Sequence, residues 1–288
     1  MKTAANLLLI LCIGLNLGCS MKRFAVKTTI QVMEPAAQAF YEEGDLEFAR
    51  EAMPANLKMM EGLLKSVPDD EALLSLLAQG YCSYSFAFLE DSEKSGDLDR
   101  AKMMYKKGFQ FGLRALPESV RAHAGGNLEK FENALNDIKD VAPLFWSAYC
   151  LGSWVNINKQ DVDAVGELIR VELMMKRALA LDEEFYHGSI HLFYGAYFGG
   201  RPKMLGGSAE KAKEHLDKAI TLRQGRFLMP KLYYAQFYAV PTQNEELFER
   251  TLREVLEASP ELMPEERLAN QVAKRRAAKL LKQKKDLF

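Results

Sequence analysis

Apolar residues recur at intervals of three and four positions along most of this chain. Two examples are Leu128-x-x-Phe131-x-x-x-Leu135 and Phe248-x-x-x-Leu252-x-x-Val255. This spacing places apolar side chains on one face of an α-helix, where they can be buried together. The sequence contains no alternating strand pattern around an Asn-Gly or Asp-Gly turn, which would indicate a β-hairpin. The periodicity therefore predicts an all-α protein.

Prolines and helix-capping residues divide this pattern into segments. They stand at Pro68-Asp69-Asp70, Pro117, Asp140 to Pro143, Asp182, Ser208, Pro241 and Pro260. Aromatic-rich helices are expected at 71–90, 141–157, 187–199 and 227–240. Each precedes a second helix in which residues recur at a spacing of four and then three positions, at 105–117, 171–178, 210–222 and 248–260.

Small residues let two helices approach each other closely, as in tetratricopeptide repeats. Ala212, Leu216 and Ala219 show the small–large–small spacing of the second helix of such a repeat. The units are unevenly spaced, with insertions at 118–140 and 200–208. The sequence therefore predicts a degenerate tetratricopeptide-like array of helical hairpins, an α-solenoid, over residues 19–265. A non-repetitive helical domain is the alternative.

The N-terminus has the sequence pattern of an export signal. Residues 7–17 form an apolar run that is too short to span a bilayer but suits a secretory signal peptide. The run ends in LGCS, which resembles a bacterial lipobox, with Asn16 where Leu is usual. We expect a signal peptide at 1–18, a lipidated Cys19 and a protein tethered to a membrane through this anchor. Ser20 after the cysteine favours the outer membrane, facing the periplasm. A plain signal peptide with an incidental cysteine is the alternative.

Cys82 and Cys150 are the cysteines that remain after Cys12 and Cys19. An exported protein can form disulfides, but both residues lie in aromatic-rich helical segments. Free cysteine is among the most buried residue types, so we expect two buried thiols, with a disulfide as the alternative. The sequence has no C-x-x-C motif to indicate a redox or zinc site.

Three segments follow one another in a particular order. They read EAMPANLKMMEGLLKSVPDDEALLSLLAQGYCSYSFAFLED at 51–91, GSIHLFYGAYFGGRPKMLGGSAEKAKEHLDKAITL at 188–222 and GRFLMPKLYYAQFYAVPTQNEELFERTL at 225–252. Together with the lipobox they resemble the T component of tripartite ATP-independent periplasmic (TRAP) transporters, the TatT family. The resemblance covers most of the mature chain and covers the tail after residue 265 less clearly.

The resemblance implies a periplasmic lipoprotein that associates with the TRAP substrate-binding subunit and forms a homo-oligomer, a trimer. It implies a channel through each protomer that accepts a small ligand, either a carboxylate or an apolar molecule. The family has no catalytic motif, so we expect no enzymatic activity, no catalytic residues and no cofactor. The alternative function is a tetratricopeptide-like scaffold for cell-envelope assembly, which would bind peptides in an open groove.

Aromatic residues are concentrated on the first helix of each pair. Such helices line the concave face or central passage of a helical-hairpin array, where Tyr and Trp offer a ligand an apolar body and a polar tip. Consecutive aromatic pairs cannot both point into the core, so some of these rings should reach a cavity or the surface. We predict a ligand-channel lining of Trp146, Tyr149, Tyr194, Tyr197, Tyr234 and Phe237. Packing between hairpins is the alternative role of these side chains.

The loop at 199–208, GGRPKMLGGS, precedes a predicted helix start at Ser208. Backbone amides at a helix start, together with Arg201 and Lys203, could contact an anion such as a carboxylate. No lysine follows the glycine pair, so the loop is not a nucleotide-binding P-loop. A simple connection between two helices is the alternative.

Other chemistry finds little support in the sequence. His187 and His191 share a helix face, but Gly188 and Ser189 break the H-E-x-x-H zinc motif, so we predict no metal site. Ser153 lacks the second glycine of a G-x-S-x-G nucleophile elbow.

The segment 266–288 is rich in Lys and Arg, although the whole chain has a formal net charge of −1. Export argues against nucleic acid as a partner. We expect a basic final helix that docks on the array through Leu268, Val272 and Leu280. Contact with lipid head groups or an acidic partner is the alternative.

Overall fold

The computed structural model describes residues 26, 28–30, 35 and 37–288, and these residues form helices and connecting loops without a β-strand. The predicted all-α class is confirmed for this part of the chain. The predicted signal peptide and Cys19 lie outside the described residues.

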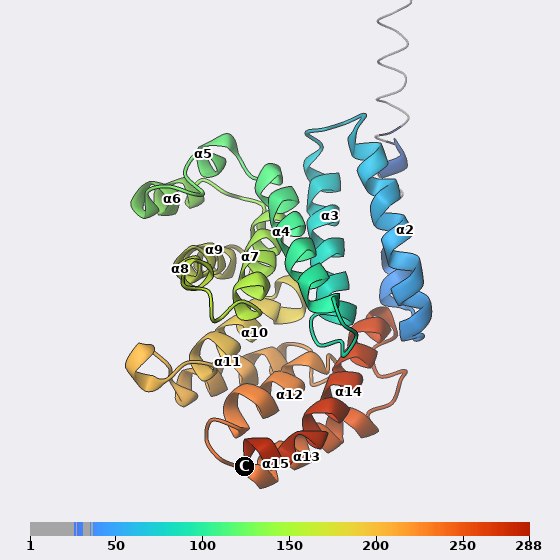
Figure 1. Cartoon of the computed structure of the whole chain (residues 1–288), viewed down its shortest axis with the longest axis vertical. Helices are drawn as coiled ribbons and strands as arrows, with labels where there is room; N and C mark the ends of the chain where they lie inside the picture. Colours follow the sequence, from blue (N-terminus) through green and yellow to red (C-terminus); the bar gives the residue numbers. More distant parts are fainter. Residues whose placement is uncertain (1–25, 27, 31–34, 36) are drawn as a thin grey trace, which may run out of the picture.

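Figure 1 shows the arrangement of the helices. The α-helices are α2 (Leu46–Leu64), α3 (Glu71–Tyr84), α4 (Asp97–Ala115), α5 (Glu118–Arg121), α6 (Leu128–Leu135), α7 (Val141–Asn156), α8 (Val162–Gly166), α9 (Leu168–Leu181), α10 (Phe185–Gly199), α11 (Ala209–Leu222), α12 (Met229–Tyr234), α13 (Glu245–Glu257), α14 (Arg267–Lys282) and α15 (Lys284–Leu287). The π-helices are η1 (Ser85–Leu89) and η3 (Ala235–Ala239), and the 3₁₀-helices are η2 (Lys203–Leu205) and η4 (Pro264–Glu266).

The predicted helix starts are confirmed at three positions where a polar side chain caps the first turn. The side chains of Asp70, Asp140 and Ser208 accept hydrogen bonds from the amides of Leu73, Ala142 and Lys211. Such caps satisfy amides that have no partner within the helix. Sequence-local chemistry therefore decides where α3, α7 and α11 begin.

Consecutive helices pack as pairs: α3 with α4, α7 with α9, α10 with α11, and α12 with η3 against α13. These are the pairs that the sequence pattern predicts. Helix α4 also packs against α7, and α10 contacts α7, α9 and α12. The C-terminal α14 returns to contact α2, so one of the last helices packs against the first long helix of the described chain (Figure 1).

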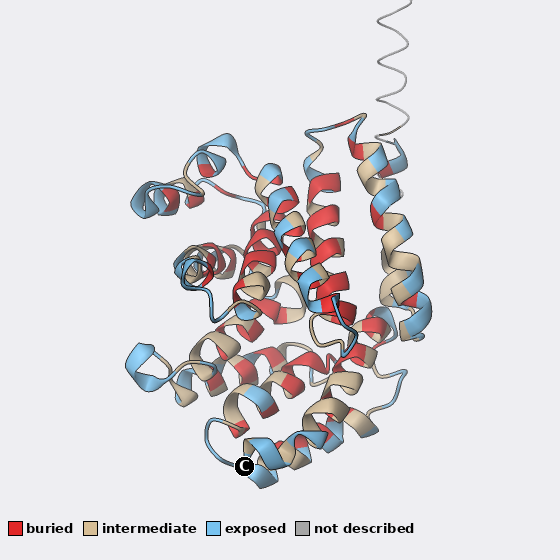
Figure 2. Cartoon of the chain, viewed as in Figure 1, coloured by how far each residue is buried: buried red, intermediate tan, exposed pale blue. Residues whose placement is uncertain are grey.

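Residues are most buried where the paired helices contact one another (Figure 2). Buried residues are concentrated on α3, α4 and α7, while α5 and α6 lie at the edge and are largely exposed. Within the described residues, Glu71–Leu89 is long and apolar enough to cross a membrane, but most of this stretch is buried inside the fold. We therefore interpret it as the core helix of the first pair.

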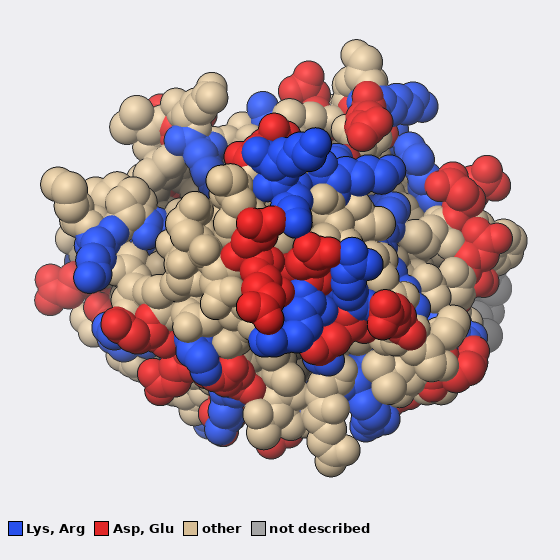
Figure 3. All heavy atoms as spheres, turned by 90° about the horizontal axis from the view of Figure 1, so that it is seen from below, with Lys and Arg blue, Asp and Glu red and all other residues tan. Residues whose placement is uncertain are grey.

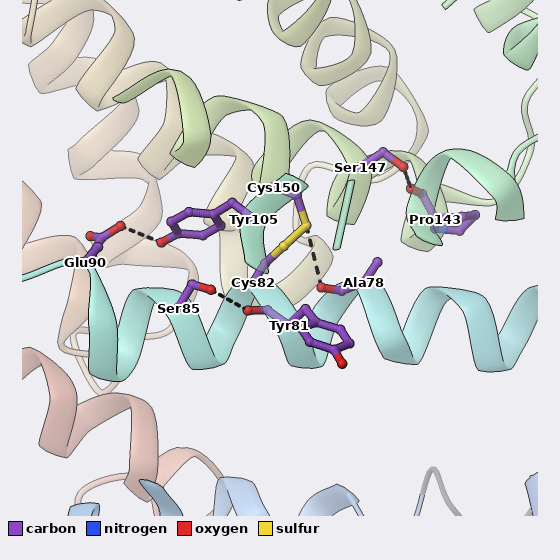
Figure 4. Close-up of a disulfide and its surroundings, with 9 residues drawn as sticks. All are labelled: Ala78, Tyr81, Cys82, Ser85, Glu90, Tyr105, Pro143, Ser147 and Cys150. Atoms are coloured by element: carbon purple, nitrogen blue, oxygen red, sulfur yellow. Dashed lines mark hydrogen bonds between the residues drawn. A yellow bond between two sulfur atoms is a disulfide. The ribbon is translucent and has the colours of Figure 1, made fainter. Parts of the chain in front are cut away.

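Cys82 on α3 and Cys150 on α7 form a disulfide, with their Cα atoms 5.5 Å apart (Figure 4). The expectation of two buried thiols is therefore wrong. Both cysteines are fully buried, as expected, but the sequence does not reveal that α3 and α7 face each other across α4. The bond joins residues 68 positions apart and ties the first helical pair to the second.

Two glycines on α4 make this arrangement possible. A Cβ atom on Gly108 would collide with the sulfur atoms of Cys82 and Cys150. A Cβ atom on Gly112 would lie 3.1 Å from the Cα atom of Ser147 on α7. Since these contacts involve backbone and a crosslink rather than flexible side chains, the small residues set the close approach of α4 to α3 and α7.

The basic C-terminal segment is docked, as predicted for Leu268 and Val272, which are buried, and for Leu280, which is partly buried against the core. Several of its cations cap the C-terminal end of η1. Arg275 and Lys279 donate hydrogen bonds to the carbonyls of Ala87 and Asp91. Cations at a helix C-terminus stabilise the unpaired carbonyls and the helix dipole.

Other basic residues of the segment form ion pairs on the surface. Lys284 contacts Glu245 at 2.6 Å and Glu249 at 3.0 Å. In Figure 3, basic and acidic side chains are interspersed on the face that is seen from below. Much of the basic character of this segment is therefore balanced by acidic residues of the same chain.

Candidate ligand-binding cavity

A cavity of about 390 Å³ lies among the helical pairs. Its wall comes from η1, α7, α10, α12, η3 and α14, with further residues from 40–53. Most of the lining is apolar or aromatic. The aromatic residues are Phe40, Tyr41, Phe86, Trp146, Tyr149, Tyr186, Phe193, Tyr197, Phe227, Tyr233 and Phe237. Cavities of this size and character commonly bind small molecules.

The cavity opens at the ends of α7 and α10. Asn156, Lys159 and Leu205 belong to its lining and are exposed. Arg201 also lies here, with its guanidinium 3.4 Å from the ring centre of Tyr197 and its Nε donating to the Tyr197 carbonyl at 2.8 Å. The mouth of the cavity therefore carries the two cations Lys159 and Arg201 beside the apolar side chain of Leu205.

A second cavity of about 130 Å³ lies between α2 and α3. It shares Phe40, Tyr41, Met53 and Ser83 with the larger one. The two cavities are therefore neighbours separated by a common wall.

Two π-helical turns shape the cavity wall. Helix α3 continues into η1 and α12 continues into η3, and each turn contributes a phenylalanine to the lining, Phe86 and Phe237. A π turn inserts one residue into the helix and shifts the direction of the side chains that follow. Such turns frequently mark functional sites.

The structure places four of the six predicted lining residues in the cavity wall: Trp146, Tyr149, Tyr197 and Phe237. Tyr194 and Tyr234 do not belong to the lining. Tyr194 is buried, with its ring stacked 4.8 Å from that of His215. The ring of Tyr234 lies 5.0 Å from that of Tyr238. The Tyr194 ring therefore packs between α10 and α11, whereas the Tyr234 ring contacts a tyrosine one turn further along the same continuous helix.

The three predicted anion contacts lie in different environments. Arg201 lines the cavity mouth, whereas Lys203 is exposed and outside the lining. The Ser208 hydroxyl caps α11 by accepting from the amide of Lys211, and it also contacts Glu210 at 3.3 Å. Of the three, only Arg201 is positioned to meet a ligand in this cavity.

A largely buried ion pair lies near η1, between Glu90, which lines the cavity, and Arg276 on α14, which does not. Arg276 Nη2 lies 2.7 Å from Glu90 Oε1, and the Tyr105 hydroxyl donates to Glu90 Oε2 at 2.5 Å (Figure 4 shows the latter). The Arg276 guanidinium also covers the ring of Phe86 at 3.8 Å. Burial lowers the pKa of Arg276, but the carboxylates of Glu90 and Asp91 outweigh it and raise the pKa above its ordinary value. Arg276 therefore stays charged inside the fold.

Three phenols of the cavity lining stay neutral. Burial raises the pKa of Tyr149 well above its usual value, and the charge of Glu90 raises it further. Burial likewise raises the pKa of Tyr233 to about 12. For Tyr186, burial and then the negative charge of Glu266 raise the pKa. The cavity therefore presents neutral hydroxyl groups on an apolar wall.

The start of α10 has a strained backbone. Tyr186 and His187 have φ values of 44° and 61°, in the left-handed region that non-glycine residues rarely occupy, and Gly188 follows with 76°. This conformation costs about 1–3 kcal/mol per residue and is frequent at functional sites. It points the Tyr186 ring into the cavity and places His187 Nε2 2.7 Å from Glu266 Oε1. Glu266 also lines the cavity.

His191 and His215 form a separate pair, with their Nδ1 atoms 2.9 Å apart. Burial lowers the pKa of His191 to about 4, and the neighbouring His215 and Lys218 lower the pKa further. Only the nearby Glu183 acts in the opposite direction and raises the pKa. No group of three or more potential metal-ligating residues occurs in the described chain.

The His191 pair makes stability depend on pH. An unfolded histidine binds a proton below its ordinary pKa of 6.5, whereas folded His191 does so only near pH 4. The unfolded chain therefore binds more protons between these values, and the free energy of unfolding should fall as the pH falls from 6.5 towards 4. For His191 alone the loss is at most about 3 kcal/mol. Urea denaturation at a series of pH values measures it.

The variant His191→Gln should flatten this pH dependence, because an amide does not titrate. His123→Gln, outside the pair, is the control and should keep the slope of the wild type. An equally steep slope in His191→Gln would contradict the assignment.

Sequence reasoning missed Glu90, Tyr186, Glu266 and Arg276. Glu266 stands in the exposed-looking stretch PEER, and nothing in the sequence distinguishes it from Glu265. The only sequence feature that points to one of these four residues is Gly188, a glycine next to Tyr186 and His187 that interrupts the helical pattern. Which buried charges face a cavity depends on contacts between distant helices.

Comparison with known proteins identifies one family and one related protein. The sequence profile described as "TRAP transporter T-component" matches residues 42–288. A protein of Treponema pallidum (strain Nichols), described as "Uncharacterized protein", is 23% identical over 310 residues, covering 94% of this chain and 93% of that protein.

Proposed function

Because the chain belongs to the TRAP transporter T-component family, we propose that it is a periplasmic accessory subunit of a TRAP-type solute uptake system. In this role it docks the system's substrate-binding subunit and holds or passes a small ligand. Cys19 carries the lipid anchor that tethers the protein to a membrane, the outer membrane in our proposal, and residues 1–18 are the signal peptide. The active form is a homo-trimer, as the family resemblance suggests.

The cavity is the observation that carries this proposal. A volume of about 390 Å³ and an aromatic wall suit a small molecule with an apolar body. The wall is assembled from several helical pairs, whereas a scaffold for envelope assembly needs an open groove for extended peptides. The smaller neighbouring cavity would extend the path of the ligand towards α2. These features favour a transport role over the scaffold.

Two further features support export and the repeat architecture. The Cys82–Cys150 disulfide suits an oxidising compartment such as the periplasm. The consecutive packing of four helical pairs is the arrangement expected of a degenerate tetratricopeptide-like array. In such an array, the first helices line the inner surface on which the ligand and the partner would meet.

The test is to extract the full chain from its own membranes with a mild detergent, crosslink it and identify what it binds by mass spectrometry. We expect a periplasmic solute-binding subunit at a stoichiometric level. Ala196→Trp, which adds a large ring within the cavity wall, should reduce retention of any small molecule. Met103→Trp adds the same bulk at an exposed position of α4 and is the matched control. Recovery of outer-membrane assembly factors without a solute-binding subunit would overturn the proposal.

A further inference from the structure

Two phenol hydroxyls in the cavity wall have no hydrogen-bond partner. They belong to Tyr186 on α10 and Tyr233 on α12, and both residues line the cavity. Neither hydroxyl is hydrogen-bonded to another of the described residues. Neither oxygen is fully enclosed by protein atoms, so each keeps surface that a molecule in the cavity can reach. A hydroxyl in apolar surroundings is costly without a partner, so these two positions favour a ligand with a hydrogen-bonding group.

Both hydroxyls are protonated and can donate a hydrogen bond. Burial raises the pKa of Tyr186 well above its ordinary value and that of Tyr233 to about 12. At neutral pH each phenol therefore keeps its proton. A protonated hydroxyl donates to an acceptor oxygen. The missing partner of each phenol is therefore a hydrogen-bond acceptor.

The rings that carry these hydroxyls are held by other aromatic side chains. The ring centre of Tyr186 lies 4.8 Å from that of Trp146, and the ring centre of Tyr233 lies 5.2 Å from that of Phe237. Trp146 and Phe237 also line the cavity. Each donor is therefore set in an aromatic wall, which suits a ligand whose remaining part is hydrocarbon.

On the side of Tyr233, the charges of the lining are balanced or lie at the mouth. Glu90 is paired with Arg276 at 2.7 Å, and these two charges act in opposite directions on the pKa of Tyr233. The cations Lys159 and Arg201 lie at the mouth of the cavity. The wall around Tyr233 therefore does not call for a charged ligand.

On the side of Tyr186, the nearby charge is a carboxylate that other protein groups hold. Glu266 Oε1 lies 2.7 Å from His187 Nε2, and Arg223 donates to the other nitrogen of the same ring. The charge of Glu266 raises the pKa of Tyr186. An anion at the Tyr186 hydroxyl would be repelled by this charge and would also lose its hydration. An uncharged acceptor avoids both costs.

We propose that the hydroxyls of Tyr186 and Tyr233 are the hydrogen-bond donors for a carbonyl oxygen of an uncharged ligand, whose hydrocarbon part occupies the aromatic cavity. This inference rests on the proposed ligand-binding function and names the class of ligand. Water in the cavity would satisfy the hydroxyls but leave the apolar wall wet. A carbonyl compound with a hydrocarbon body satisfies the hydroxyls and covers the wall at once.

The first test compares two probes of similar size on the wild-type full chain held in lipid nanodiscs. Acetophenone carries an uncharged carbonyl, and benzoate carries a carboxylate on the same ring. Both are titrated at pH 7 by calorimetry, with empty nanodiscs as the blank. We expect acetophenone to bind about tenfold more tightly than benzoate or better. Equal or tighter binding of benzoate overturns this inference, points to the cations at the mouth and leaves the cavity as a ligand site. Binding of neither probe overturns both proposals.

The second test combines Tyr186→Phe with Tyr233→Phe, which removes both hydroxyls and keeps both rings. The probes are acetophenone and α-methylstyrene, in which a CH₂ group replaces the carbonyl oxygen. We expect the double variant to bind acetophenone about fivefold more weakly than the wild type, the loss expected for one hydrogen bond. Its affinity for α-methylstyrene, which has no acceptor oxygen, should be unchanged or higher.

The matched control is Tyr194→Phe with Tyr234→Phe, the same change at two tyrosines outside the lining. It should leave the affinities for acetophenone and α-methylstyrene as they are in the wild type. An unchanged affinity of the Tyr186→Phe/Tyr233→Phe variant for acetophenone, or an equal loss for both probes, overturns the inference. Circular dichroism establishes that the variants are folded. If the Tyr186→Phe/Tyr233→Phe variant does not fold, the comparison of acetophenone with benzoate on the wild type decides.

Discussion

Replacement of Arg276 by methionine should lower the free energy of unfolding by about 3–5 kcal/mol. Methionine fills a similar volume but leaves the carboxylate of Glu90 buried without its cation. The variant also loses the hydrogen bond from Arg276 to the carbonyl of Phe86 in η1. Urea denaturation at pH 7, followed by far-UV circular dichroism, measures the loss.

A surface pair provides the control for this prediction. Arg253 and Glu249 also form an Arg–Glu ion pair, but the Arg253 side chain is 61% exposed. Exposed pairs contribute about 0–1 kcal/mol, so Arg253→Met should have little effect. The double variant Glu90→Gln with Arg276→Met should recover part of the stability, because the unpaired charge is gone. A loss below 1 kcal/mol for Arg276→Met alone would show that Glu90 finds another partner.

Reduction of the Cys82–Cys150 disulfide should destabilise the fold by about 4 kcal/mol. The bond closes a loop between residues 68 positions apart, and its loss restores conformational entropy to the unfolded chain. The measurement is urea denaturation of the wild type with and without a thiol reductant. The reductant should move the midpoint to a markedly lower urea concentration.

The Cys82→Ala/Cys150→Ala variant is the control for the reductant itself. It should be as unstable as the reduced wild type or more so, because it also loses the packing of the sulfur atoms against Gly108. Its midpoint should not respond to reductant. Equal midpoints for the oxidised and reduced wild type would contradict the prediction and would mean that the crosslink adds no stability.

The aromatic residues show where prediction from the sequence stops. Tyr233 and Tyr234 are adjacent and chemically identical, yet Tyr233 lines the cavity and Tyr234 does not. Tyr197 lines it, whereas Tyr194, one turn earlier on the same helix, packs against His215. The pattern predicts correctly that these helices carry aromatic faces. Which ring reaches the cavity depends on the neighbouring helix and on the π turns at η1 and η3.

The sequence by itself determined the all-α class, the helix starts at Asp70, Asp140 and Ser208, and the succession of helical pairs. These features depend on interactions within a few residues: apolar periodicity, capping side chains and proline. Only the tertiary structure decided that Cys82 meets Cys150, that Arg276 pairs with Glu90, and that Glu266 faces the cavity. Each of these depends on which residues distant in the chain become neighbours, and that follows from how the helices pack, with glycines such as Gly108 setting how closely they approach.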